Sequence, residues 1–294
     1  MQTRRPSIQT APLVGILLLL DSMHFVFARS LLPYISPAVS VLYVLGVSTV
    51  EVGLFALARR QLHWHSLKRH FWFFLGIGFM IAVSTNINYE AVAFIDPGTA
   101  SLLNQTSILF GLGFGVLWMR DKLTWKQIGG ACLTLAGVFI ISFQRGNYLR
   151  FGSVLVVGAA LMYALHAALS KRFGDGMDFL DFFFGRLLFT TAVLFVFSTV
   201  RGALAWPTAA AWPRLILVGT VDVVLSRTLY YIALRRLTMS VHTLILTLTP
   251  ILSVLWSLLL FDVVPTVARL VGGAAIITGV LVVTLNRANV KRNS

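Results

Sequence analysis

An aspartate and an arginine, Asp222 and Arg227, lie within an otherwise apolar stretch of the chain. A charged side chain at the centre of a membrane helix costs at least about 2.5 kcal/mol, so such residues usually serve a function. Arg227 could hold a carboxylate, while Asp222 could meet an amine or bind a proton. Their spacing turns the two side chains about 140° apart on a helix, which disfavours a mutual pair but lets both border one cavity with Tyr230 and Tyr231. The alternative is that they form structural ion pairs with another helix.

Amide and hydroxyl side chains also recur at helical spacing in two other apolar stretches. Asn86 and Tyr89 lie three residues apart in one of them, and Asn104, with Gln105 beside it, belongs to a polar stripe in the next. Residues three or four positions apart share one face of a helix. We expect these four side chains to contribute to substrate binding. The alternative is hydrogen bonding between helices, which contributes about 0.6 kcal/mol on average.

Two histidines, His24 and His166, stand in similar apolar surroundings in the two halves of the chain (166 − 24 = 142). Histidine titrates near neutral pH, so a histidine in a buried cavity suits proton coupling or gating. Asp21 lies one turn before His24, and Asp222 is the third candidate for proton coupling. A satisfied structural histidine is the alternative at both places.

The same offset of 142 positions recurs elsewhere and indicates an internal duplication. The Tyr89-x-Ala pattern returns as Tyr231-x-Ala, and the stretch 123–137 returns as 265–279. Separated matches at one spacing are hard to obtain by chance.

The composition identifies lipid as the solvent of most of the chain. Hydrophobic residues make up 57% and charged residues 12%, whereas a soluble domain carries roughly 25% charged residues. The net charge of +14 does not indicate nucleic-acid binding, because the basic residues cluster at helix ends on alternate loops. The single Cys132 lies in an apolar stretch, so the chain forms no internal disulfide and no cysteine-based metal site.

Spanning the hydrocarbon core takes roughly 20 residues, and breaks at charges, Pro and Gly divide the chain into ten such segments. The predicted spans are 12–29, 37–58, 71–93, 98–118, 126–143, 152–170, 179–200, 212–234, 239–261 and 267–285. Five spans per half is an odd number, so the second half, 147–294, must enter the bilayer upside down relative to the first, 1–146. The sequence therefore predicts an all-α integral membrane protein with two inverted five-helix repeats around a central cavity.

The positions of the basic residues predict the orientation. Of the 24 Lys and Arg residues, two lie inside spans and sixteen fall on the side of the two termini. The other side receives the remaining six, which are Arg29, Arg145, Arg150, Arg201, Arg214 and Arg269. The positive-inside rule places both termini in the cytoplasm, and we expect an inner or plasma membrane location.

The second half contains YYIALRRLTMSVHTLILTLTPILSVLWSLLLFDVVPTVARLVGGAAIITGVLVV, and the first half carries a related stretch from Tyr89 onward. These segments resemble the drug/metabolite transporter superfamily, in particular its EamA-type ten-helix exporters. The family tends to have an arginine early in the second helix of each half. Arg186 fits this pattern, while Val44 stands at the corresponding place in the first half. Because Arg186 lies about seven residues from a predicted helix end, we expect it to snorkel to the membrane surface.

The resemblance implies a cavity lined by spans one, three, four, six, eight and nine, and the export of small metabolites such as amino acids. No metalloprotease, nucleophile-elbow or P-loop motif occurs in the sequence, so we expect no enzyme activity, cofactor or metal site. We therefore predict a secondary transporter that exports an amino acid or related zwitterion, with protons as a candidate coupling ion. The alternatives are a transporter of a cation, nucleobase, vitamin or nucleotide-sugar, and a membrane scaffold or receptor that transports nothing.

Overall fold

The computed structural model describes residues 10–119, 124–144, 147–149, 151–174, 176–236 and 246–293. The regular secondary structure of the described part is helical apart from a short antiparallel hairpin between α8 and α9. Its elements are α1 (Thr10–Ser22), α2 (His24–Leu31), α3 (Pro37–Ala58), α4 (Trp64–Arg69), α5 (Phe71–Ala91), α6 (Pro97–Asn104), α7 (Thr106–Met119), α8 (Trp125–Ser142), β1 (Phe143–Gln144), β2 (Asn147–Leu149), α9 (Phe151–Phe173), α10 (Phe179–Val200), α11 (Trp212–Val218), η1 (Gly219–Leu225), α12 (Ser226–Arg236), α14 (Thr249–Phe261) and α15 (Val267–Asn293).

Eight described segments are long and apolar enough to cross a membrane. They match eight predicted spans, and three of these, 37–58, 179–200 and 267–285, coincide with the prediction. The predicted eighth span corresponds to the run α11, η1 and α12. The predicted ninth span is represented by the shorter apolar helix α14, because its first residues lie outside the described part of the chain.

The second helix of each half meets its counterpart at a symmetric contact. The hydroxyls of Thr49 on α3 and Thr191 on α10 lie 2.9 Å apart, and the two residues are 142 positions apart in the chain. A residue touches its own equivalent only beside a two-fold axis. The hydrogen bond therefore marks the pseudo-two-fold axis that relates the halves.

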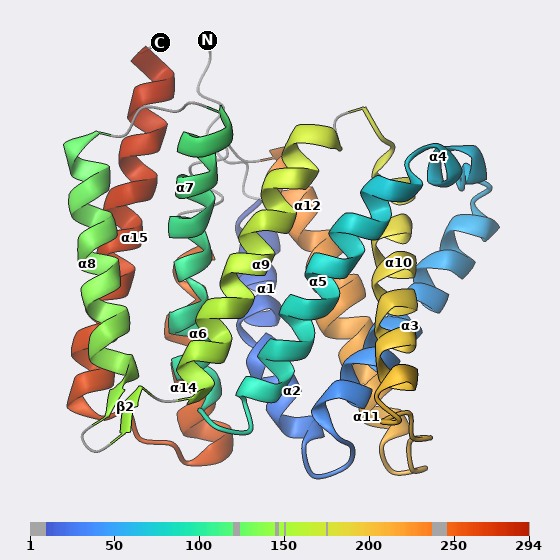
Figure 1. The fold of residues 1–294 in the computed structure, drawn as a ribbon, viewed down its shortest axis with the longest axis horizontal. Coiled ribbons are helices and arrows are strands. Elements are labelled where there is room, and N and C mark those ends of the chain that lie inside the picture. Colours follow the sequence, from blue (N-terminus) through green and yellow to red (C-terminus); the bar gives the residue numbers. More distant parts are fainter. Residues whose placement is uncertain are drawn as a thin grey trace.

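The fifth helices of the two halves, α8 and α15, lie side by side (Figure 1). A Cβ on Gly130 would lie 2.7 Å from the carbonyl oxygen of Gly279, and one on Gly137 would lie 2.5 Å from that of Gly272. Gly272 and Gly279 are the 142-position equivalents of Gly130 and Gly137, so the contact is reciprocal and the helices are antiparallel. Glycine is needed here because the two backbones touch, as in other membrane helix pairs.

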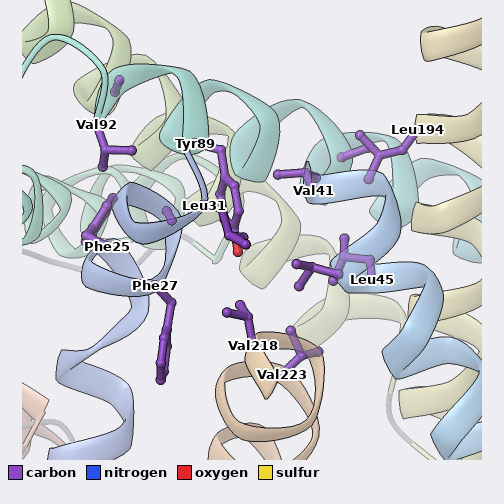
Figure 2. Close-up of a cluster of buried hydrophobic side chains, with 14 of the residues drawn as sticks. Phe25, Phe27, Leu31, Val41, Leu45, Tyr89, Val92, Leu194, Val218 and Val223 are labelled. Carbon is purple, nitrogen blue, oxygen red and sulfur yellow. The ribbon is translucent and has the colours of Figure 1, made fainter. Parts of the chain in front are cut away.

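The repeats enclose the site between these two helix pairs. In Figure 1, α8 and α15 lie at one side of the molecule, α3, α4 and α10 lie at the other, and α1, α5, α6, α9, α12 and α14 occupy the middle. An apolar cluster fills part of the interior where α2, α3, α5 and α11 converge (Figure 2); its labelled members include Phe25, Phe27, Leu31, Val41 and Val218.

Candidate functional site

A cavity of about 290 Å³ lies between the two halves. Its walls come from both halves, and the apolar part of the lining is continuous with the cluster of Figure 2 through Phe25, Val41 and Leu45. The polar and charged side chains in its wall are Asp21, His24, Ser84, Thr85, Asn88, Tyr89, Ser101, Asn104, Gln105, Ser107, Tyr163, Arg186, Asp222, Arg227, Tyr230 and Thr249. The spans that the resemblance implied line it, and α3 and α10 contribute as well.

Two contacts between charged or titratable side chains cross the cavity wall from the first half to the second. His24 Nδ1 lies 2.8 Å from Asp222 Oδ2, and Arg227 Nη2 lies 3.2 Å from Asp21 Oδ1. Asp222 and Arg227 thus border one cavity without pairing with each other, as their spacing predicted. Each also pairs with a side chain of another helix, Arg227 with Asp21 and Asp222 with His24, which agrees with the structural alternative as well.

Asp222 owes its position to a widened helical turn. It lies in η1, a π-helical segment between α11 and α12, and its side chain is only 1% exposed. Single π-helical turns are rare and occur frequently at functional sites. The segment is held against α3, because Ser48 Oγ donates to Gly219 O at 3.0 Å and Thr220 Oγ1 donates to Glu51 at 2.6 Å.

The first span is interrupted at Met23, between α1 and α2. Helix α14 satisfies the groups at the break: Ser253 Oγ donates to Ser22 O at 2.6 Å, and Trp256 Nε1 donates to Ser22 Oγ at 2.8 Å. Broken helices are tolerated at membrane depth where neighbouring helices or a cavity satisfy the freed polar groups. The break sets Asp21 and His24, on its two sides, against the second half of the chain.

Arg186 does not snorkel to the membrane surface, so that expectation is wrong. Its side chain is 8% exposed and lines the cavity, and its Cζ lies 5.4 Å from the centroid of the Phe183 ring. The first turn of α10 is covered by the connection before α4, where the backbone N–H and Nδ1 of His63 contact the buried carboxylate of Asp181.

The remaining predicted site residues divide into three groups. Tyr89, Asn104, Gln105 and Tyr230 line the cavity. Asn86 and His166 are buried outside the lining, and the ring of His166 lies against that of Tyr163, with centroids 5.5 Å apart. Tyr231 belongs to α12, but its side chain lies outside the described part of the structure.

Sequence reasoning missed several lining residues that the repeat could have revealed. Seven pairs of lining residues are related by the offset of 142 positions, so one member predicts the other. These pairs are Asp21 and Tyr163, Val44 and Arg186, Ile81 and Val223, Thr85 and Arg227, Asn88 and Tyr230, Asn104 and Leu246, and Ser107 and Thr249. Applying the offset to Asp21 and Arg227 would have found Tyr163 and Thr85.

An inverted-repeat membrane bundle with interrupted helices around a buried polar cavity defines the class of secondary transporters. The model of the EamA-like transporter family matches residues 13–143 and again 150–285, and the chain belongs to this family. It is therefore a multi-pass membrane transporter, as the resemblance implied.

Two curated relatives and one solved structure are similar to the chain. A probable terminal-alkyne amino-acid exporter of Streptantibioticus cattleyicolor is 23% identical over 69% of this chain and 69% of the relative. The uncharacterized transporter YdfC of Bacillus subtilis is 26% identical over 70% of this chain and 67% of the relative. A crystal structure with 19% identity superposes with a TM-score of 0.65 over 96% of this chain and 99% of the other, which supports the fold.

Proposed function

We propose that the chain is a secondary transporter that exports a small zwitterion of the amino-acid class by alternating access. The observation that carries this proposal is the central cavity, whose charged pairs join the two halves of the repeat. A site at a repeat interface can open to each side in turn as the halves rock against one another.

The size and lining of the cavity support a small amphipathic substrate. Its volume of about 290 Å³ is at the lower end of the range for ligand sites, roughly 300 to 1,000 Å³. Its lining combines charged, hydroxyl and amide groups with apolar side chains such as Leu45, Ile81 and Val223. The name of the exporter from Streptantibioticus cattleyicolor points to the same substrate class.

The pair formed by His24 and Asp222 is the proposed proton-coupling site. Both side chains can carry a proton, and the pair joins α2 to η1 across the repeat interface. A change in its charge would alter an interaction between the two halves, which is what coupling requires. His166 has no lining position and is assigned no proton-coupling role in this proposal.

We further propose that the repeats divide near residue 146 and that both termini are cytoplasmic in an inner or plasma membrane. The first match to the family ends at residue 143, and the second begins at residue 150. The short helix α4 and the connection between α9 and α10 lie at the end of the molecule where α15 ends (Figure 1). Arg59, Arg60, Lys68 and Arg69 flank or belong to α4, and such basic loops face the cytoplasm.

Counterflow in liposomes tests the proposal. Purified full-length protein should exchange external labelled L-leucine for internal unlabelled L-leucine, and Asp222→Asn or Arg227→Gln should abolish the exchange. The matched controls are Asp178→Asn and Arg201→Gln, which make the same changes at exposed ends of α10. Normal exchange by both cavity variants would refute the site assignment.

A ligand screen by thermal shift separates the other candidate functions, because binding to the folded state raises the melting temperature. Stabilisation by organic cations, nucleobases, vitamins or nucleotide-sugars without stabilisation by amino acids would replace the substrate class. Absence of flux for every compound that stabilises the protein would favour a receptor or scaffold.

A further inference from the structure

We infer that Arg186 holds the substrate carboxylate, and that the substrate is an amino acid or related acid with an apolar body. This inference rests on the proposed function and names the recognition groups within that site.

Among the described residues that line the cavity, Arg186 is the arginine that no carboxylate neutralises. Arg227 is already neutralised by Asp21 at 3.2 Å, and Asp222 is engaged by His24 at 2.8 Å. Among the described residues, the guanidinium of Arg186 makes no ion pair, and its Nε has no hydrogen-bond partner. Its charge lies over the ring of Phe183, which cannot replace a carboxylate.

The other described carboxylates that form side-chain contacts are committed elsewhere. Asp96 pairs with Arg269 at 3.0 Å, Asp181 contacts His63, and Glu51 accepts from Thr220. His166 lies close enough to Arg186 for their charges to interact. A histidine carries no negative charge, so it cannot neutralise the arginine.

A buried cation without a counterion is unfavourable, since its solvation by water is lost. An arginine also presents a planar set of donors that matches a carboxylate in a bidentate geometry. A substrate carboxylate that enters the cavity would therefore find its counter-charge at Arg186 without breaking an existing ion pair.

The repeat shows that packing does not require an arginine at this place. The equivalent residue in the first half is Val44, which lines the same cavity from α3. Two equivalent positions thus face the cavity, one apolar and one cationic. Val44, with its neighbours Val41 and Leu45, supplies an apolar wall for the substrate body, whereas Arg186 supplies the charge.

The experiment compares L-leucine with L-leucinamide, which keeps the ammonium and the side chain but replaces the carboxylate with a neutral amide. Binding to the purified full-length protein is measured by competition against labelled L-leucine and by thermal shift. Wild type should prefer L-leucine to L-leucinamide at least tenfold. In Arg186→Val and Arg186→Gln, L-leucine affinity should fall at least tenfold while L-leucinamide affinity, measured by thermal shift, stays within about twofold.

Arg186→Val copies the side chain that the first half carries, so it should fold. Arg201→Gln is the control, because Arg201 is exposed at the other end of α10 over the ring of Phe197. Without ligand, the melting temperature of both Arg186 variants should equal or exceed that of wild type, since a buried unpaired charge is removed. Arg186→Lys, which keeps the charge but not the planar donors, should recover part of the preference.

Two results would overturn the inference. One is an unchanged preference for L-leucine in the Arg186 variants, and the other is a ligand-free melting temperature well below those of wild type and Arg201→Gln, which would make Arg186 structural. If instead wild type neither binds nor exchanges L-leucine, the proposed function fails and the inference fails with it. Wild-type exchange together with unaffected Arg186 variants would reject the role of Arg186 alone.

Discussion

The pair between Asp21 and Arg227 should be strongly coupled, and a double-mutant cycle can measure this. Its atoms are 3.2 Å apart, and the side chains are 16% and 20% exposed. At this distance the Coulomb energy is about 5 kcal/mol for an effective dielectric constant of 20. Part of this is lost to desolvation, and breaking a buried pair from one side costs about 3 to 5 kcal/mol. Because both side chains are partly exposed, we take the lower value of about 3 kcal/mol for each single variant.

Asp21→Asn and Arg227→Met should therefore each lower the melting temperature by about 6 to 12 °C, at about 2 to 4 °C per kcal/mol for a chain of this size. The double variant leaves no uncompensated charge and should lose much less than the sum of the two. Arg201→Met, at an exposed position, should change the melting temperature little. Additive losses in the double variant would refute the argument that Asp21 neutralises Arg227.

The same variants test what the pair does for binding. Asp21→Asn removes the partner of Arg227 and so places a second available cation in the cavity beside Arg186. The affinity for L-glutamate relative to L-leucine should rise in this variant, because a second carboxylate then has a counter-charge. An unchanged ratio in a competition assay would mean that Arg227 does not become available.

Three further outcomes are expected. Gly137→Val should destabilise the protein by about 1 to 3 kcal/mol through overpacking, because its Cβ would lie 2.5 Å from the carbonyl oxygen of Gly272. Gly129→Val is the control on the same helix: its Cβ would meet open space, so the melting temperature should change little. Asp222→Asn should stop accumulation of L-leucine driven by a pH gradient, and persistence of that accumulation in liposomes would exclude it as the coupling group. Asn88→Ala should weaken L-leucine binding severalfold in a competition assay, because Asn88 lines the cavity. If a conservative substitution of a buried residue outside the lining weakened binding equally, the effect of Asn88→Ala would not indicate a direct contact with the substrate.

The spans could be predicted from the sequence because lipid imposes a local rule. An apolar segment of the required length is sufficient evidence for a spanning helix, and 37–58 and 179–200 agree with the structure residue for residue. The inverted arrangement followed from an odd number of spans per repeat. Neither conclusion requires knowledge of which helices are in contact.

The pairing of charges could not be predicted in the same way. His24 and Asp222 are 198 positions apart in the chain. Their predicted depth in the membrane indicates that both need partners, but it does not indicate which residues those partners are. The widened turn of η1 also has no signal that sequence reasoning used, although it determines how Asp222 meets the first span. Arg186 was misplaced for a related reason: its distance from the helix end was known, but its burial in the wall of the cavity was not.

The duplicated chain keeps its symmetry where the halves pack and departs from it where a ligand would bind. Thr49 meets Thr191 at the axis, and the glycines of α8 meet those of α15 reciprocally. In the cavity, by contrast, equivalent positions carry unlike side chains: Val44 in the first half corresponds to Arg186 in the second. A cavity with identical walls would present the same groups to both ends of a substrate. A zwitterion has unlike ends and one apolar side chain, so a site that orients it requires unequal side chains at equivalent positions. The substitutions that break the symmetry are therefore the residues to which substrate recognition is most directly assigned.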